Sequence, residues 1–368
     1  MRPLRIAFPL LSVLVTLVVA EGFLRWAGFG SGAVELHSAM LQYDPQLGWA
    51  KTPGASVSYR WLGARIVETS NSEGARGPEH GVEPPDGRRR VLLLGDSFCE
   101  GYLVSDDQVF SAQLEAMAPV EAVNLGVAGY STDQQLLLYR RVVDRYRPQQ
   151  TVLLFFDNDV WFNALAVEHR SPKPLFEFDG TELRLTGVPV PPPDPSSSSA
   201  PSGGRAESLR LLRVFTTAAR QAAQNRSDDW QATLEPANEF LLYRRDPPEN
   251  VEAAWRLTDE LLGRLDSEVE QASGRLTVLY VPNVAAVSDD SLAATRALYG
   301  MSSQEWDLRL VERRLEAVCR RRGIPFISPV GRLRARREQG ETLYFASDGH
   351  WTADGHRAVA QILAQELQ

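Results

Sequence analysis

Cysteine is scarce in this sequence, with two residues among 368, Cys99 and Cys319. So few cysteines exclude a disulfide-stapled small domain. Neither lies in a CxxC or Cys/His cluster of the kind that holds zinc, so no metal site is expected. We expect both thiols to be buried as small apolar groups, and the sequence does not decide whether they pair.

An excess of positive charge is also missing: 39 Lys and Arg face 47 Asp and Glu, for a net charge of −8. A general nucleic-acid binder usually carries a basic excess, so we expect no nucleic-acid partner. Two arginine clusters, 88–90 and 320–322, do not change this balance. We interpret them as solvated charge or as complements to helix dipoles.

The chain has one long apolar run, at its N-terminus. Arg2 and Arg5 precede the run Ile6–Ala20, which is shorter than the about 20 residues that span a bilayer. Apolar character continues at Phe23 and Trp26, past the small residues of a would-be cleavage site, so an uncleaved anchor is favoured over a signal peptide. The positive-inside rule then predicts a single-pass protein with its bulk on the periplasmic or cell-surface side.

No internal repeat is visible, and the composition, with 43% hydrophobic residues, is that of a globular protein. We predict an anchor or signal over 1–30, a lead-in segment over 31–89 and a main domain over 90–368. Short β-like pieces occur in the lead-in at 57–61 and 64–67. An insertion at about 162–248 contains VPVPPPDPSSSSAPSGG, which is typical of a linker or an exposed loop.

The main domain alternates strand and helix patterns. Apolar runs predict strands buried on both faces, and helical spacing predicts helices between them. Ser131 and Gln134 match a capping box at the start of one helix, which ends before Pro148. The order predicts a parallel α/β sheet with right-handed crossovers. The expected strands are 91–94, 122–125, 151–156, 276–281 and 324–327, and the main helices are near 109–117, 132–147, 251–271, 306–322 and from 352 onward.

Four polar segments lie where strands end or the last helix begins: Gly95–Phe98, Asn124–Gly129, Asp157–Asp159 and Ser347–Trp351. Ligands of open α/β sheets bind outside the carboxyl ends of the strands. Each segment alone fits an ordinary turn or a helix cap. The chemistry they offer together is a serine hydroxyl, backbone and amide donors for an oxyanion, and a histidine beside a carboxylate.

In this order and context the four segments resemble the four blocks of the SGNH (GDSL-type) hydrolase family, over roughly Val91 to Leu363 without the insertion. The resemblance implies a three-layer α/β/α fold with a central parallel sheet, and no metal or organic cofactor. It implies that Ser97 is the nucleophile, His350 the general base and Asp348 its orienting acid. It also implies an oxyanion hole built from the Ser97 N–H, Gly129 and Asn158.

The lead-in supports a narrower resemblance. Its segment Asn71–Gly77 is similar to one found ahead of the catalytic domain in membrane-anchored bacterial relatives. Two departures stand out in the blocks themselves. Phe156 occupies a position where the family usually has glycine, so a narrower site is expected. The last block reads Asp348-Gly349-His350-Trp351, one residue shorter than usual and similar to that of polysaccharide O-acetyltransferases.

The expected function is serine-dependent hydrolysis of an acyl ester of an envelope lipid or glycan, through an acyl-enzyme. The first alternative is an O-acetyltransferase that modifies an extracytoplasmic polysaccharide, and the second a non-catalytic binding protein on the same fold. We interpret His356, a second histidine near the last block, as a packing or surface residue. Asp159, Trp161 and Trp351 are candidates to line a substrate pocket.

Overall fold

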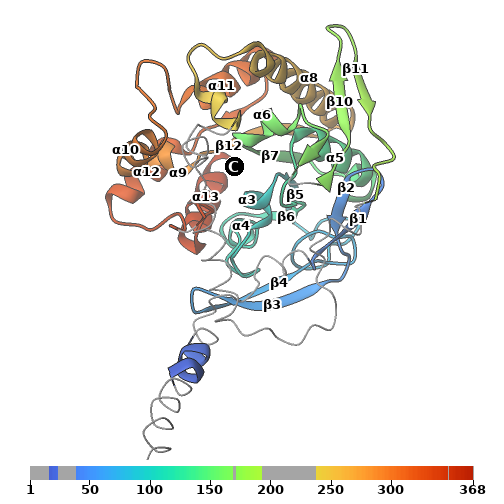
Figure 1. The fold of residues 1–368 in the computed structure, drawn as a ribbon. Helices are drawn as coiled ribbons and strands as arrows, with labels where there is room; N and C mark the ends of the chain where they lie inside the picture. Colours follow the sequence, from blue (N-terminus) through green and yellow to red (C-terminus); the bar gives the residue numbers. More distant parts are fainter. Residues whose placement is uncertain (1–15, 24–38, 169–170, 193–237, 347, 368) are drawn as a thin grey trace, which may run out of the picture.

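A five-stranded parallel sheet forms the centre of the protein in a computed structural model (Figure 1), with the strand order β13-β12-β7-β5-β6. The structure describes all residues except 1–15, 24–38, 169–170, 193–237, 347 and 368. All five strands fall within two residues of the predicted runs. Their bounds are Arg89–Leu94 (β5), Val120–Asn124 (β6), Gln150–Phe156 (β7), Arg275–Val281 (β12) and Phe326–Ile327 (β13).

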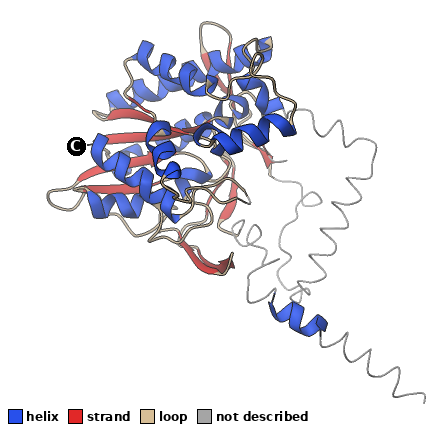
Figure 2. Ribbon diagram, turned by 90° about the vertical axis from the view of Figure 1, so that its left-hand side faces the viewer, coloured by secondary structure: helices blue, strands red, loops and turns tan. Residues whose placement is uncertain are grey.

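The central strands are buried because helices cover both faces of the sheet (Figure 2), which is why their sequences are continuous apolar runs. Helix α4 (Phe110–Met117) packs against α13 (Ala353–Glu366). On the other face α5 (Thr132–Tyr146) packs against α8 (Glu249–Gln271), and α11 (Leu310–Arg322) lies beside α8 (Figure 1). This arrangement confirms the predicted α/β fold with a central parallel sheet.

The predicted capping box at the start of α5 is wrong, although the helix itself is found. Ser131 makes no side-chain cap and instead donates to Asp133 Oδ1 at 2.9 Å. Gln134 is fully buried and donates to the Leu47 carbonyl at 2.8 Å. Packing of the lead-in on this helix therefore takes up the side chain that a capping box would have used.

One arginine of the cluster at 88–90 is also not solvated, contrary to expectation. Arg90 is 0% exposed and pairs through Nε with Glu121 Oε2 at 2.7 Å. Its guanidinium also donates to the Gly81, Val82 and Tyr146 carbonyls. Arg90 thus ties the lead-in to the sheet. The cluster at 320–322 does end a helix, as predicted.

The lead-in consists of two antiparallel hairpins, β1 (Leu41–Asp44) with β2 (Gly48–Lys51) and β3 (Ser56–Trp61) with β4 (Ala64–Thr69). The insertion contributes two more hairpins and a 3-10 helix that the sequence analysis did not predict. They are β8 (Val167–Glu168) with β9 (Ser171–Pro172), β10 (Leu175–Phe178) with β11 (Leu183–Thr186), and η3 (Asn238–Tyr243). Most of the predicted linker at 188–204 falls outside the described residues.

Most of the apolar run Ile6–Ala20 likewise falls outside the described residues. Residues 16–23, which are described, are helical. Within the described part of the chain, no helix combines the length and the apolar composition that crossing a membrane requires. The remaining helices are short: α3 (Ser97–Glu100), α6 (Asn158–Phe162), α9 (Val284–Val287), α10 (Asp289–Leu298) and α12 (Val330–Glu338).

Candidate active site

The site forms at the point where the chain reverses its direction across the sheet. From β5 the chain crosses to β6 on one side and returns to β7 on the other. Ser97 follows β5 and Asn158 follows β7, so both stand at the carboxyl ends of the two strands that flank this switch point. Open α/β sheets bind their ligands at such points.

Ser97 is the first residue of the short helix α3, and Asp96 caps this helix through a bond from Phe98 N to Oδ1 of 2.9 Å. A residue in the first helical turn has no intrahelical partner for its N–H, which leaves the Ser97 N–H able to meet a ligand. Burial raises the pKa of the capping Asp96 to about 6, although its bond from Phe98 N and the nearby His350 both oppose that shift.

His350 approaches the serine from the loop before α13. Its Nε2 lies 2.8 Å from Ser97 Oγ, a hydrogen-bond distance. The imidazole packs against the rings of Phe98 and Tyr102, whose centroids lie 4.8 and 5.0 Å away. Aromatic packing therefore holds the ring where it can receive the serine proton.

Asp348 lies beside the other end of that imidazole. Its Oδ1 accepts a hydrogen bond from His350 N at 2.9 Å and lies 3.5 Å from His350 Nδ1. Gly349 adopts φ +81°, and this left-handed turn curls the loop so that both neighbouring side chains face one site. The 3.5 Å separation exceeds a hydrogen bond, and catalytic bonds are often this long before substrate arrives.

Gly129 and Asn158 line the same cleft of about 350 Å³ as Ser97, Asp348 and His350. Gly129 has φ +79°, and a Cβ there would lie 3.2 Å from Glu168 Oε1, so the loop needs glycine. The Asn158 Oδ1 is buried with no hydrogen-bond partner in the described structure. All five predicted site residues are thus brought to one cleft.

Glu100, at the end of α3, links the serine helix to the loop that carries Gly129. Its buried carboxylate accepts from Ala128 N through Oε2 at 2.7 Å and pairs through Oε1 with Lys51 Nζ. Lys51 also pairs with Glu68 at 2.6 Å, and all three side chains are at most 3% exposed. The lead-in strands β2 and β4 therefore hold the Gly129 loop in place, a link that sequence reasoning missed.

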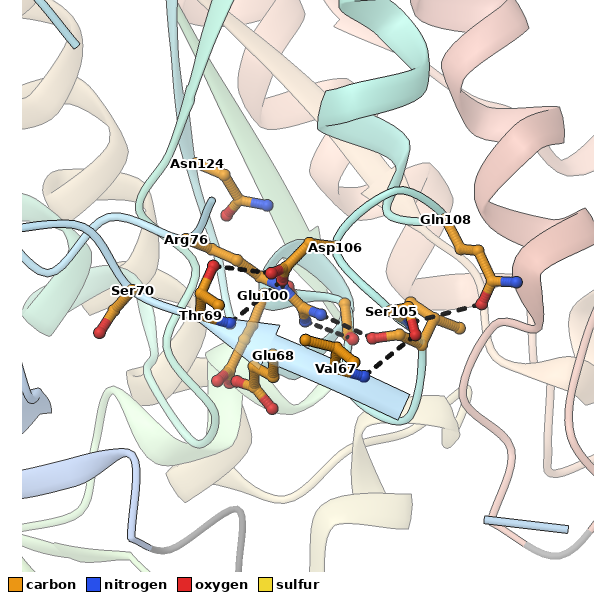
Figure 3. A network of polar contacts seen from close by, with 12 residues as sticks. Val67, Glu68, Thr69, Ser70, Arg76, Glu100, Ser105, Asp106, Gln108 and Asn124 are labelled. Carbon is orange, nitrogen blue, oxygen red and sulfur yellow. Dashed lines mark hydrogen bonds and ion pairs between the residues drawn. The ribbon is translucent and has the colours of Figure 1, made fainter. Parts of the chain in front are cut away.

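Arg76, from the Asn71–Gly77 segment, performs a similar task at the same C-terminal end of α3 (Figure 3). Its Nη1 donates to the Glu100 and Gly101 carbonyls at 2.7 and 2.6 Å, and Nη2 donates to the Val104 carbonyl. A guanidinium here satisfies carbonyls that the helix leaves unpaired. The lead-in is thus part of the scaffold of the site.

Several residues that line the cleft were not predicted, among them Glu168, Asn283 and Val284. Asn283 follows strand β12, so the rule that polar residues gather at strand ends could have found it. Glu168, in the insertion, carries no sequence signal of this kind. Phe156, the departure from the family pattern, does line the cleft and packs against Phe98 with centroids 4.8 Å apart.

The other candidate pocket residues do not line the cleft. Asp159, Trp161 and Trp351 are not among its walls, and Asp159 and Trp351 are at most 1% exposed. His356 is buried, as the packing interpretation predicted, and accepts from Phe110 N at 3.4 Å. Burial lowers the pKa of His356 to about 3.

Both cysteines are buried, as expected. Both are also free, so they do not form the disulfide that the sequence left open. Neither belongs to a cluster of metal-binding side chains: among the residues that the structure describes, no three His, Cys, Asp or Glu are arranged to hold an ion. The chemistry available in the cleft is that of a serine, a histidine and a carboxylate.

A serine hydrogen-bonded to a histidine at the switch point of a parallel sheet is the arrangement of a serine ester hydrolase. The chain belongs to the GDSL-like Lipase/Acylhydrolase family, whose model matches residues 93–358, and it is a serine ester hydrolase of that family. The family assignment confirms the predicted resemblance to the GDSL-type hydrolases, and it confirms the prediction of an enzyme over that of a non-catalytic binding protein. Among curated proteins, no sequence matches the chain.

Solved structures with a similar fold include three with low identity. A lipolytic protein of the G-D-S-L family from Veillonella parvula is 12% identical with TM-score 0.39, covering 75% of this chain and 97% of that one. The acetyl xylan esterase AlAXEase is 11% identical with TM-score 0.41, covering 76% and 100%. A catalytic mutant of the acetylxylan esterase Axe2 from Geobacillus stearothermophilus is 11% identical with TM-score 0.39, covering 76% and 95%.

Proposed function

We propose that the protein hydrolyses an acyl ester through a covalent intermediate on Ser97. The observation that carries this proposal is the 2.8 Å contact between Ser97 Oγ and His350 Nε2. The contact lies in a cleft whose other walls include Gly129 and Asn158.

The reaction proceeds in two steps. His350 takes the Ser97 proton as Oγ attacks the ester carbonyl, and Asp348 stabilises the resulting imidazolium. The N–H groups of Ser97 and Gly129 and the Asn158 amide hold the oxyanion. The intermediate collapses as His350 returns the proton to the leaving alkoxide, which departs as an alcohol. Water, deprotonated by His350, then attacks the acyl-enzyme and releases the acid and free Ser97.

The substrate proposed is an acyl ester of an envelope lipid or glycan, reached by a catalytic domain held outside the cytoplasm. Support comes from Arg2 and Arg5 ahead of the apolar run Ile6–Ala20. We expect the full chain to stay with membranes in alkaline carbonate and to be released by detergent. Release by carbonate alone would contradict the anchor.

Acyl transfer to a sugar hydroxyl is the second candidate, and the short block Asp348-Gly349-His350-Trp351 is the observation that favours it. Both reactions pass through the same acyl-enzyme and differ only in whether water or an alcohol attacks it. Following a labelled acetyl group into free acetate or into an added oligosaccharide separates them.

The test of the proposed function is hydrolysis of p-nitrophenyl acetate and butyrate by the protein and by its Ser97→Ala variant. Removing the nucleophile of a serine triad typically costs about a million-fold in kcat, so we expect turnover to fall to the background rate. Equal rates from the two proteins would contradict serine catalysis at this position.

A further inference from the structure

A second cavity, of about 510 Å³, adjoins the catalytic cleft. The two share four lining residues, Phe156, Asn158, Asn283 and Val284. Most of the remaining wall is apolar and comes from η3, α6, α10 and the chain before α11: Phe162, Phe240, Leu242, Leu298, Tyr299 and Leu308. An apolar chamber therefore lies next to the cleft that holds the proposed nucleophile.

A third hollow, of about 750 Å³, also adjoins the cleft and shares Val284, Asp348 and Gly349 with it. Its character differs from that of the apolar chamber, because its walls carry Arg337 and Glu341. The cleft thus adjoins both an apolar chamber and a polar groove.

The chemistry of ester cleavage decides which part of the substrate enters which hollow. His350 must protonate the leaving oxygen, so the alcohol lies on the side of the histidine loop, where Asp348 and Gly349 line the polar groove. Asn158 faces the carbonyl oxygen in the proposed mechanism, and it lines the apolar chamber. The acyl chain therefore extends into the chamber.

Three polar side chains of the chamber wall, Asp157, Tyr243 and Asn283, are engaged with one another. Asp157 accepts hydrogen bonds from Tyr243 Oη at 2.5 Å, Tyr280 Oη at 2.7 Å and Asn283 Nδ2 at 2.8 Å. These bonds leave mainly apolar surface for a ligand. A cavity of about 150 Å³ suffices to bind benzene, so a chamber of 510 Å³ has room for far more than a methyl group.

We propose that this chamber binds the acyl chain of the substrate, and that the chain is an aliphatic group longer than acetyl, carried on a polar alcohol. This inference rests on the proposed function and deepens it. Burial of each methylene contributes up to about a fourfold preference in such a site. A six-carbon acyl group is then favoured over acetyl by at least about tenfold, even if only part of that gain is realised.

The test compares kcat/KM for p-nitrophenyl hexanoate and acetate. The Thr295→Trp variant places an indole in the chamber wall from helix α10, at a half-buried position that can accept it. The matched control is Ala297→Trp, an exposed position on the same helix that does not line the chamber. We expect a hexanoate-to-acetate ratio above ten in the protein, a tenfold loss of that ratio in Thr295→Trp, and no change in the control.

A ratio of one or less, unmoved by Thr295→Trp, would overturn the proposal while leaving serine hydrolysis intact. Should neither ester be turned over, the proposed function fails, and calorimetric titration of the Ser97→Ala variant then tests the chamber alone. Binding of hexanoate but not acetate, lost when Thr295→Trp is added, supports the chamber as an acyl site. Equal binding of the two acids, or none, would overturn it.

Discussion

At the scale of single residues, mutation of Asn158 distinguishes a role in substrate binding from a role in stabilising the transition state. Its side chain lines both the cleft and the apolar chamber, and its Oδ1 has no hydrogen-bond partner within the described structure. Removal of this oxygen therefore breaks no hydrogen bond of the described fold. Loss of one oxyanion donor typically costs about 2.7–4 kcal/mol of transition-state stabilisation.

We predict that Asn158→Ala lowers kcat for p-nitrophenyl esters about 100- to 1,000-fold and leaves KM and the melting temperature nearly unchanged. Steady-state kinetics beside a thermal melt measures these quantities. A KM increase at constant kcat would assign Asn158 to substrate binding alone and remove it from the oxyanion hole.

The residues of the site could be predicted from the sequence because their four segments together resemble the blocks of a known family, and each stands at a recognisable boundary. Ser97 and Asn158 come directly after buried apolar strands, and His350 stands three residues before a helix. The residues that support them could not be predicted. Arg76 reaches carbonyls 24 and 25 residues away, and Gln134 one that is 87 residues away. Such partners depend on how the lead-in packs, which no local pattern records.

At the scale of elements, the buried ion cluster of Lys51, Glu68 and Glu100 joins β2 and β4 to α3. Lys51→Met removes the cation and leaves carboxylates buried beside each other. Loss of one partner of a buried pair costs about 3–5 kcal/mol, so we predict a loss of this size in the free energy of unfolding.

Urea denaturation measures that loss, and Arg256→Met is the matched control. Arg256 pairs with Glu249 on the surface, with side chains 56% and 81% exposed. Removal of such a pair costs at most about 1 kcal/mol. A loss for Lys51→Met no larger than that of the control would show that the cluster does not secure the lead-in.

Asp157 also joins elements, since its partners come from η3, β12 and the start of α9. Burial raises its pKa from 3.8 to about 6, against the effect of its hydrogen bonds. The folded protein therefore holds this proton more tightly than the unfolded chain, and stability from this group falls as pH rises from about 4 to 6.

We predict that Asp157→Asn, which cannot titrate, loses less stability than the protein between pH 4 and pH 7. The difference in unfolding free energy between the two should shift by up to about 3 kcal/mol in favour of the variant over this range. Urea titrations at four pH values check this. Parallel curves for the two proteins would show that Asp157 is ionised with an ordinary pKa.

The helices and strands divide into those that the sequence predicts and those that it does not. Strands β5, β7 and β12 are buried on both faces, so a continuous apolar run marks each of them. Strands β8 and β9 have two residues each, too few for any periodicity to appear. The sheet was therefore predictable, and the hairpins that border the site were not.

At the scale of the whole molecule, the segment before the main domain is part of the catalytic scaffold. Arg76 and Lys51 both hold the C-terminal end of α3, and Trp49 donates from Nε1 to the Ala128 carbonyl at 3.0 Å beside Gly129. Residues of the main domain and the insertion line one cleft, which adjoins an apolar chamber and a polar groove, and the lead-in supports it from behind. This arrangement fits an enzyme for esters with an apolar acyl end and a polar alcohol.

The central claim is that Ser97 is the nucleophile, activated by His350. The most direct measurement is mass spectrometry of the intact protein and of its peptides after treatment with a p-nitrophenyl alkylphosphonate. We predict one adduct per chain, located on Ser97, and slow or absent labelling in His350→Ala, because the hydroxyl then lacks its base. An unlabelled Ser97 in the unmodified protein, or an adduct on another serine, would contradict the account.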